Sequence, residues 1–411
     1  MSGMSGTQSS SLTFSRDFYF LVAVRFLGSF SVQLQAVILG WQMYQFTRAP
    51  IDLGLIGLTE AIPAIGLALF AGYLVDRGNP KRMISAVVFL SLLSMVIAWT
   101  ARTTDELYFA AFLTGVARSF YSPCFQSLLP RLVPKALLNR AIAMSTSAMK
   151  LAYITGPAIA GLVLGWKGAG PAYALGTGFF ISALAALIFL RYDHAPFRKT
   201  TRLEISFSAE LLAGLRFVFK NRILLSVLSL DMFAVLFGGV TAMLPVVSEE
   251  ILHTGPTGLG FLRASPAIGA LGMSLWLVRY PIEKNAGRLL LQVVFGWGLC
   301  ILIFALSRNV FLSCGILGLS GALDSISMII RGSIVQLCSP EAMRGRIAAV
   351  NSIFIGSSNE IGAFESGLAA QLFGLVPSFY FGGVMTLAVV GVIARFVPEL
   401  RRLDLRELAR H

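Results

Sequence analysis

The sequence predicts an all-α membrane protein in which twelve transmembrane helices form two pseudo-symmetric bundles of six. Three observations lead to this expectation. Of the 411 residues, 56% are hydrophobic and 13% are charged, whereas a soluble domain carries about 25% charged residues. The apolar residues gather in runs long enough to cross a bilayer, and parts of the first half of the chain recur in the second. This composition excludes a soluble enzyme, a nucleic-acid-binding protein and a disordered scaffold.

Twelve apolar runs make up most of the chain, and each has roughly the 20 residues that a spanning helix needs. They lie at residues 18–46, 53–75, 83–101, 107–129, 140–165, 171–191, 223–247, 258–279, 287–306, 309–330, 347–373 and 377–397. The longest polar stretch separates the sixth run from the seventh. We therefore expect an N-terminal bundle at residues 1–191, a cytoplasmic linker at residues 192–222, and a C-terminal bundle with a short basic tail at residues 223–411.

The distribution of Lys and Arg predicts the orientation of the chain, because cytoplasmic loops carry an excess of these residues. With the amino terminus inside, 25 of the 33 Lys and Arg residues fall on the cytoplasmic side and four on the outer side. Both termini are thus expected in the cytoplasm. The net charge of +13 follows from this topology, so the expected partner is the lipid bilayer and no nucleic acid is expected.

Two segments half a chain apart are similar, which indicates an internal duplication. Residues 57–66 read GLTEAIPAIG and residues 260–269 read GFLRASPAIG, with six of ten positions identical. Two duplicated bundles are suited to alternating access, in which one half rocks against the other around a site at the membrane midplane. Glu60 and Arg263 occupy the same position of the repeat, so we hypothesise an ion pair between the halves that opens and closes.

Two short motifs resemble signature sequences of the major facilitator superfamily. Residues 72–82 read GYLVDRGNPKR and resemble its cytoplasmic loop motif, although two positions depart from the pattern. Residues 156–161 read GPAIAG and resemble a Gly-Pro motif common in its antiporters. Proline removes a backbone hydrogen bond and glycine permits close helix packing, so a kink that serves packing alone is the alternative. The resemblance implies gating roles for Gly72, Asp76, Arg77, Gly156 and Pro157.

A further segment, PEAMRGRI at residues 340–347, resembles the bacterial branch that includes the enterobactin exporter and borders macrolide-efflux and lysophospholipid transporters. Arg140 and Arg346 recur half a chain apart and are expected to act in gating. The resemblance implies a monomeric, proton-coupled exporter (antiporter) of a small organic molecule such as a siderophore, in the bacterial cytoplasmic (inner) membrane. The alternatives are a multidrug or macrolide efflux pump, a lysophospholipid flippase and a non-transporting membrane sensor.

Ionisable residues fall within the apolar runs, where each costs a few kcal/mol unless it is paired or faces water. They are Arg25, Glu60, Arg118, Lys150, Asp231, Arg263, Asp324, Glu360 and Glu365. Five acids against four bases suggest mutual compensation. We expect Asp231 to couple transport to protons, and the other carboxylates that could do so are Glu60, Asp324, Glu360 and Glu365. A structural pairing of Asp231 with Arg25 or Lys150 is the alternative.

Small and polar residues at helical spacing predict the walls of a substrate cavity. The residues expected there are Arg25, Ser29, Gln33, Arg118, Arg263, Ser352 and Gly356. The arginines suit an anionic or hydrogen-bond-rich substrate, while close packing through small residues is the alternative explanation for such faces. The sequence has no Gly-Lys dipeptide, and its three histidines lie outside the runs. We therefore expect no cofactor, no metal site and no enzyme activity.

Overall fold

The computed structural model describes residues 14–192, 207–282, 284–340 and 343–408. These ranges fold into helices and contain no strand. The long helices are α1 (Arg16–Thr47), α2 (Pro50–Arg77), α3 (Pro80–Thr100), α4 (Thr104–Leu132), α5 (Leu138–Lys167), α6 (Ala169–Phe189), α8 (Arg222–Phe237), α10 (Gly255–Arg279), α11 (Ala286–Leu306), α12 (Val310–Leu337), α13 (Arg344–Phe373) and α14 (Leu375–Phe396). The shorter elements are η1 (Lys135–Leu137), α7 (Phe207–Lys220), η2 (Val240–Met243), α9 (Leu244–Val246), η3 (Val247–Ile251), α15 (Pro398–Arg401) and α16 (Leu405–Leu408).

The ends of the helices follow from local sequence. Thr103 and Glu106 form a reciprocal capping box at the start of α4, which satisfies backbone N–H groups that have no partner within the helix. The side chain of Asn79 accepts hydrogen bonds from the first backbone N–H groups of α3 in the same way. Gly168 and Gly374 end α5 and α13 with φ angles of +82° and +89°, a conformation that only glycine adopts at little cost.

Ten helical segments of the described residues are long and apolar enough to cross a membrane. One of them runs from α8 through η3 (Arg222–Ile251), because α8 alone has 16 residues and is too short to cross a membrane. The helices α4 and α13 have comparable lengths of 29 and 30 residues but carry more charged residues, and they are not among the ten. The prediction of an all-helical membrane protein is confirmed for the described residues. Ten of the twelve predicted spans meet this criterion, and the count of twelve stays a prediction.

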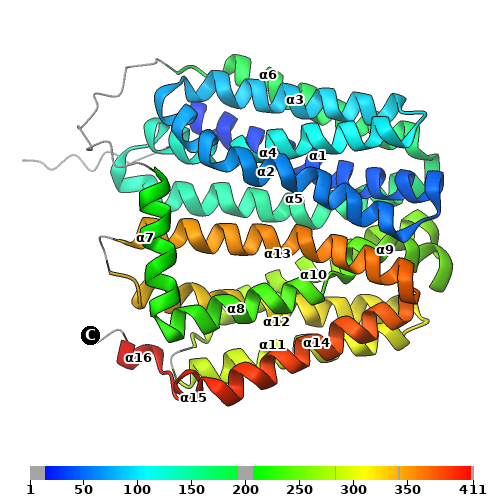
Figure 1. The fold of residues 1–411 in the computed structure, drawn as a ribbon. Helices are drawn as coiled ribbons and strands as arrows, with labels where there is room; N and C mark the ends of the chain where they lie inside the picture. The colour runs from blue at the N-terminus through cyan, green and yellow to red at the C-terminus, as the bar shows by residue number, and fades with distance from the viewer. Residues whose placement is uncertain (1–13, 193–206, 283, 341–342, 409–411) are drawn as a thin grey trace, which may run out of the picture.

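Two groups of helices pack side by side, as Figure 1 shows. The first half, α1–α6, is joined by contacts of α1 with α5 and α6 and of α4 with α2 and α3. The second half, α8–α14, is joined by contacts of α12 with α10 and α11, of α14 with α11, and of α13 with α8. Between the halves, α2 packs on α13 and α5 packs on α10.

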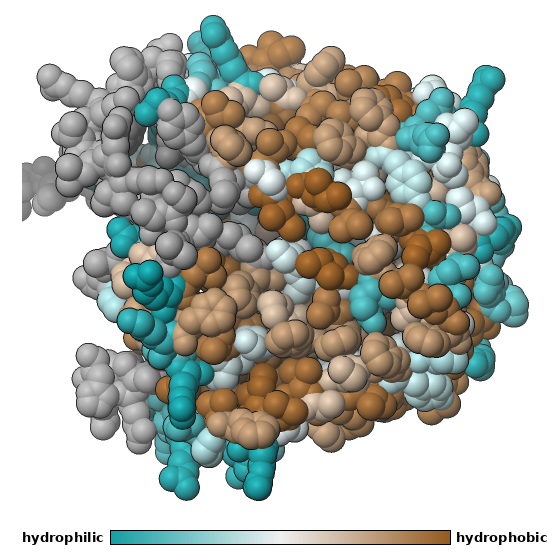
Figure 2. Space-filling view, in the orientation of Figure 1, coloured by the Kyte–Doolittle hydropathy of each residue, from teal (hydrophilic) through white to brown (hydrophobic). Residues whose placement is uncertain are grey.

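The amphipathic helix α7 lies across one end of the molecule and packs on α8 and α13. It falls within the stretch predicted as a linker, of which residues 193–206 lie outside the described residues. We call this end, where α15 and α16 also lie, the α7 end. Figure 2 shows a broad apolar band in the middle of the molecule, with polar side chains toward the two ends. This is the surface that a bilayer requires.

Close backbone contacts between the two halves occur at the end opposite α7. There, a Cβ atom on Gly54 of α2 would lie 2.9 Å from the main-chain oxygen of Ala363 in α13. Gly72 lies five turns further along the same face of α2, and a Cβ atom there would have nothing within 4 Å. The same is true of Gly356, which lies two turns before Ala363 on α13. The helices α2 and α13 therefore diverge toward the α7 end.

Candidate functional site

A cluster of three charged side chains connects the halves in the middle of the apolar band. Arg118 of α4 donates a hydrogen bond of 2.6 Å from Nη1 to Oε1 of Glu360 in α13, and the same nitrogen lies 3.9 Å from Oε2 of Glu60 in α2. The Arg118 side chain is 52% exposed, whereas those of Glu60 and Glu360 are 17% and 13% exposed. An exposed arginine at this depth indicates that one side of the cluster faces an open space between the halves.

The hypothesised ion pair between Glu60 and Arg263 is absent from the described residues in this conformation. Glu60 lies beside Arg118 instead. Arg263 extends from α10 toward α1, so that a Cβ atom on Gly40 would lie 3.5 Å from its Nη2 atom. The Nε atom of Arg263 is buried and has no hydrogen-bond partner in the described part of the chain. The duplicated positions 60 and 263 thus carry opposite charges, but the ion pair of Glu60 is with Arg118.

A second charged cluster lies within the second half. Asp231 of α8 forms an ion pair with Arg331 of α12, and Nη2 of Arg331 lies 3.8 Å from Oδ1 of Asp324, also on α12. Asp231 and Arg331 are both buried, each 8% exposed. The sequence-based alternative, in which Asp231 pairs with Arg25 or Lys150, is wrong. The partner, Arg331, lies one residue beyond the predicted end of the tenth apolar run and is not among the ionisable residues expected within the runs.

The helix α12 is longer than the apolar run that predicted it. The tenth apolar run was ended at residue 330, yet α12 continues to Leu337. Asp324 and Arg331 are seven residues apart, which places them on one face of a helix. Extending the run by two turns would have revealed this pair, because an acid and a base at this spacing lower the cost of burying each other.

A cavity of about 220 Å³ lies beside this second cluster. It is surrounded by α8, η2 and α10–α13, and its polar lining comes from Thr241, Ser320, Asp324 and Asn359. Asp324 also lines a smaller adjoining pocket that contains Asp231. The cavity has the size of a site for a small ligand or for part of a larger one. None of the residues predicted to line the substrate cavity lines this one.

The predicted cavity residues of α1 lie within the first half instead. The guanidinium of Arg25 lies over the rings of Tyr121 and Phe125 of α4, at 5.1 and 4.5 Å from their centroids. Its Nη2 atom donates to Sδ of Met149 in α5 at 3.1 Å. Ser29 Oγ lies 3.4 Å from the hydroxyl of Tyr121.

Gln33 and the Gly-Pro motif meet where α1 packs on α5. A Cβ atom on Gly156 would lie 2.9 Å from the Cβ atom of Gln33. Pro157 follows within α5, and its main-chain oxygen would lie 2.9 Å from a Cβ atom on Gly260. The motif therefore permits two close approaches, to α1 on one face and to α10 on the other. Its packing role is visible, and its role in gating stays a prediction.

Other predicted residues contribute less to these clusters. Glu365 is partly buried, accepts a hydrogen bond of 3.5 Å from Ser366, and forms no ion pair with a described residue. Arg140 is exposed and lies 5.8 Å from the ring centroid of Phe14. Ser352 lies in α13 and Asp76 lies in the last turns of α2, but both side chains are outside the described part of the structure.

The remaining signature residues lie at the α7 end. Arg77 ends α2 and is exposed. Arg346 is in the first turn of α13, where a Cβ atom on Gly214 of α7 would lie 3.0 Å from its main-chain oxygen. The gating role of these residues stays a prediction.

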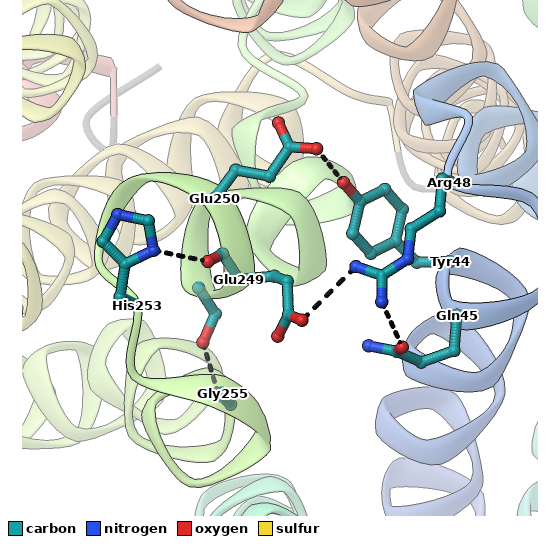
Figure 3. A network of polar contacts seen from close by, with 8 residues as sticks. Tyr44, Gln45, Arg48, Glu249, Glu250, His253 and Gly255 are labelled. Carbon is teal, nitrogen blue, oxygen red and sulfur yellow. Dashed lines mark hydrogen bonds and ion pairs between the residues drawn. The ribbon is translucent and has the colours of Figure 1, made fainter.

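A third polar network joins the halves at the end opposite α7, and the sequence analysis did not predict it. As Figure 3 shows, Tyr44 and Arg48 at the end of α1 point toward Glu250 and Glu249 of η3. The Tyr44 hydroxyl donates to Oε1 of Glu250, and Nη1 of Arg48 lies 3.3 Å from Oε1 of Glu249. Residues 247–251 form a π-helix, a form common at functional sites. The adjacent acidic pair was the sequence signal for this network.

The described residues contain no group of three or more His, Cys, Asp and Glu side chains that could hold a metal ion. The four cysteines are free thiols, and Cys124 and Cys300 are buried.

The fold is that of solved transporters. The crystal structure of the nucleoside transporter NupG matches with a TM-score of 0.72 at 13% identity, covering 93% of this chain and 99% of that one. A bacterial homologue of the human lysosomal transporter Spinster, in its inward-facing and unoccupied conformation, matches with a TM-score of 0.73 at 12% identity, covering 96% and 97% of the two chains. The likeness to these structures establishes the fold of the chain.

The chain belongs to the transmembrane secretion effector family, whose profile matches residues 11–410. It is thus a membrane transporter of the major facilitator type. It is similar to the multidrug efflux pump Tap of Mycolicibacterium fortuitum, with 25% identity over 89% of this chain and 91% of Tap. It is also similar to the enterobactin exporter EntS of Escherichia coli O1:K1, with 26% identity over 92% and 91% of the two chains. The resemblance to this branch is thereby confirmed. These relatives are transporters rather than enzymes.

Proposed function

We propose that this protein is a proton-coupled exporter of a small organic molecule that works by alternating access in the bacterial inner membrane. In this proposal twelve helices span the bilayer, α4 and α13 included, as two bundles of six joined by a linker that contains α7. The α7 end and both termini are cytoplasmic, in keeping with the excess of Lys and Arg there. One chain contains both halves, so a monomer suffices for transport.

The described conformation is then inward-facing. Glycine contacts between the halves and the network of Tyr44, Arg48, Glu249 and Glu250 close the outer end. The divergence of α2 and α13 opens the inner end. Transport requires the outer contacts to break and the inner end to close, as one half rocks against the other.

The observation that carries the proton coupling is the buried pair of Asp231 and Arg331 next to a cavity. A proton that binds to Asp231 cancels the charge that holds Arg331. Arg331 is then free to move toward Asp324, which already lies 3.8 Å away. Protonation would thus rearrange α8 against α12. One buried arginine with two carboxylate partners is a group whose arrangement a single proton can change.

Reconstituted vesicles test this coupling. The purified chain is placed in proteoliposomes, and the movement of protons and substrate is followed with and without an imposed pH gradient. We expect the gradient to drive flux in the unmodified chain, and Asp231→Asn to abolish this drive while substrate binding remains. A control substitution at an exposed carboxylate, Glu399→Gln, should leave flux unchanged. Undiminished proton-driven flux in Asp231→Asn would move the role to Glu60, Asp324 or Glu360.

Two substrate classes are supported by relatives of similar identity. A siderophore is the first candidate, because the relative EntS exports enterobactin. A drug is the second, because the relative Tap is a multidrug efflux pump. A deletion strain grown without iron, with its medium and cell contents profiled, separates the two. Loss of an iron chelator from the medium with its accumulation inside the cells supports the first, and an unchanged profile with increased drug sensitivity supports the second.

A further inference from the structure

The first half of the molecule contains a partly buried arginine, Arg25, whose charge no described residue neutralises. The Nε and Nη1 atoms of Arg25 are buried and have no hydrogen-bond partner in the described part of the chain. Each of the five ion pairs among the described residues involves another arginine, namely Arg48, Arg118 or Arg331. An unpaired cation inside an apolar band is costly, and such residues mark binding sites by default.

The side chain of Arg25 is nevertheless firmly held. Tyr121 and Phe125 cover its guanidinium, and Met149 accepts one of its hydrogen bonds. The hydroxyl of Tyr121 donates to the main-chain oxygen of Arg25 at 3.2 Å, which fixes the ring against α1. We call Arg25, Tyr121, Phe125 and Met149 the Arg25 cage. The cage orients the guanidinium without compensating its charge, because rings and a thioether attract a cation only weakly compared with a carboxylate.

The surroundings of the cage add positive charge and offer access. Lys150 follows Met149 in α5, is exposed, and forms no ion pair with a described residue. Tyr153, one turn further along α5, is 44% exposed and lies within electrostatic range of both Arg118 and Tyr121. Arg118 itself faces the open space between the halves. The cage therefore lies next to the surface that is accessible in the described conformation.

We propose that the Arg25 cage binds the anionic group of an aromatic substrate when the transporter is open at the α7 end. A guanidinium binds carboxylates, sulfonates and phenolates through paired hydrogen bonds, and the free donors of Arg25 supply them. The partly buried ring of Tyr121 provides a face for an aromatic group of the substrate. Phe125 is 4% exposed, so its ring holds only the guanidinium. This inference rests on the proposed export function for its physiological meaning, but binding itself requires neither a gradient nor a direction.

Calorimetric titration of the purified full-length chain in neutral detergent tests the proposal with two matched probes. Naphthoate carries a carboxylate on an aromatic ring system, and naphthamide has the same rings without the charge. We expect the unmodified chain to bind naphthoate about tenfold or more tightly than naphthamide, the difference that hydrogen bonds to a charged group produce. Equal affinity for the two probes in the unmodified chain would overturn the proposal without any substitution.

Arg25→Gln should remove this preference, and Arg25→Lys should retain part of it because the charge remains. Arg102→Gln, at an exposed position between α3 and α4, is the control and should bind both probes like the unmodified chain. Arg263→Gln tests whether the anion binds instead to Arg263, the other arginine with a nitrogen atom that has no hydrogen-bond partner among the described residues. If Arg263→Gln loses naphthoate binding while Arg25→Gln keeps it, the anion site is at α10 and the proposal is wrong.

A further variant covers the case in which Arg25→Gln does not elute as a single folded species. Tyr121→Leu should weaken both probes while the preference for naphthoate persists, since it removes a ring and no charge. Unchanged binding of both probes in Tyr121→Leu would contradict the cage. The outcomes are distinguishable from those of the export proposal. Binding through Arg25 without any flux in proteoliposomes defeats export alone, whereas proton-driven flux with no anion preference defeats the Arg25 cage alone.

Discussion

Gly161 of α5 and Gly260 of α10 face each other across the boundary between the two halves. A Cβ atom on Gly161 would lie 2.4 Å from the Cα atom of Gly260 and 2.6 Å from the main-chain oxygen of Pro256. The atoms that would be struck belong to the backbone and cannot rotate away. The contact holds together the end opposite α7, so its disruption acts on one conformation and not on the other.

We expect Gly161→Ala to shift the equilibrium toward the conformation that is open at this end. Double electron–electron resonance between spin labels at Arg102 and Arg308, which are exposed on the two halves, measures the shift as a longer distance. Gly178→Ala is the matched control, because a Cβ atom on Gly178 would have nothing within 4 Å. Identical distance distributions for the two variants would show that the contact does not limit the conformation.

The bridge between Arg118 and Glu360 is expected to couple the stabilities of the two halves. A double-mutant cycle with Arg118→Gln and Glu360→Gln should give an interaction free energy of about 0.5–3 kcal/mol in thermal unfolding, the range for residues in direct contact. A second cycle with Glu60→Gln and Arg263→Gln should give a smaller value, since these two form no ion pair here. An equal or larger value for the second cycle would contradict the described arrangement.

The buried pair of Asp231 and Arg331 should affect stability and transport differently. Arg331→Met leaves Asp231 as an unpaired buried charge and should lower the free energy of unfolding by about 3–5 kcal/mol. Asp231→Leu should lower it less, because Asp324 still lies 3.8 Å from Arg331. The double variant should be close to the unmodified chain, because two apolar side chains replace both charges. Proton-driven flux should be lost in all three variants. Flux that returns together with stability in the double variant would mean that the pair is structural.

At the outer end, Tyr44 should matter more than Arg48. Tyr44 is fully buried, and Tyr44→Phe removes its hydrogen bond to the exposed Glu250 carboxylate, at a cost of about 0.5–1.5 kcal/mol. The side chains of Arg48 and Glu249 are 54% and 30% exposed, and such exposed pairs contribute about 0.2–1 kcal/mol. Thermal unfolding of Tyr44→Phe and Arg48→Gln compares the two. A larger loss for Arg48→Gln would reverse the assignment of the main outer contact.

Much of the fold could be predicted because a membrane imposes simple rules on sequence. The length of an apolar run and its bounding Pro, Gly or charged residues predict a helix, and the repeat around Glu60 and Arg263 indicated the duplication. Helix ends were less predictable. The predicted run ending at residue 330 belongs to α12, which continues for two more turns. Arg331 was therefore not predicted to lie inside a spanning helix.

The clusters could not be derived from the sequence because they depend on helix rotation and on conformation. The presence of Arg118, Glu60 and Glu360 inside the runs was visible, but which acid meets the arginine is decided by how α2, α4 and α13 are turned. The repeat favoured Glu60 with Arg263, although pseudo-equivalent positions need not touch in a given conformation. The outer network depends on the π-helix after α9, for which Glu249 and Glu250 gave only a weak signal.

The cluster of Asp231, Arg331 and Asp324 is built from α8 and α12, whereas the Arg25 cage is built from α1, α4 and α5. No helix belongs to both. If both are sites, a proton and an anion do not compete for the same atoms, and each acts on the other only through the population of the two conformations. The strength of such coupling is a free energy that can be large or small. The protein would then tolerate slippage, and the number of protons spent on each exported molecule would vary with the size of the gradient.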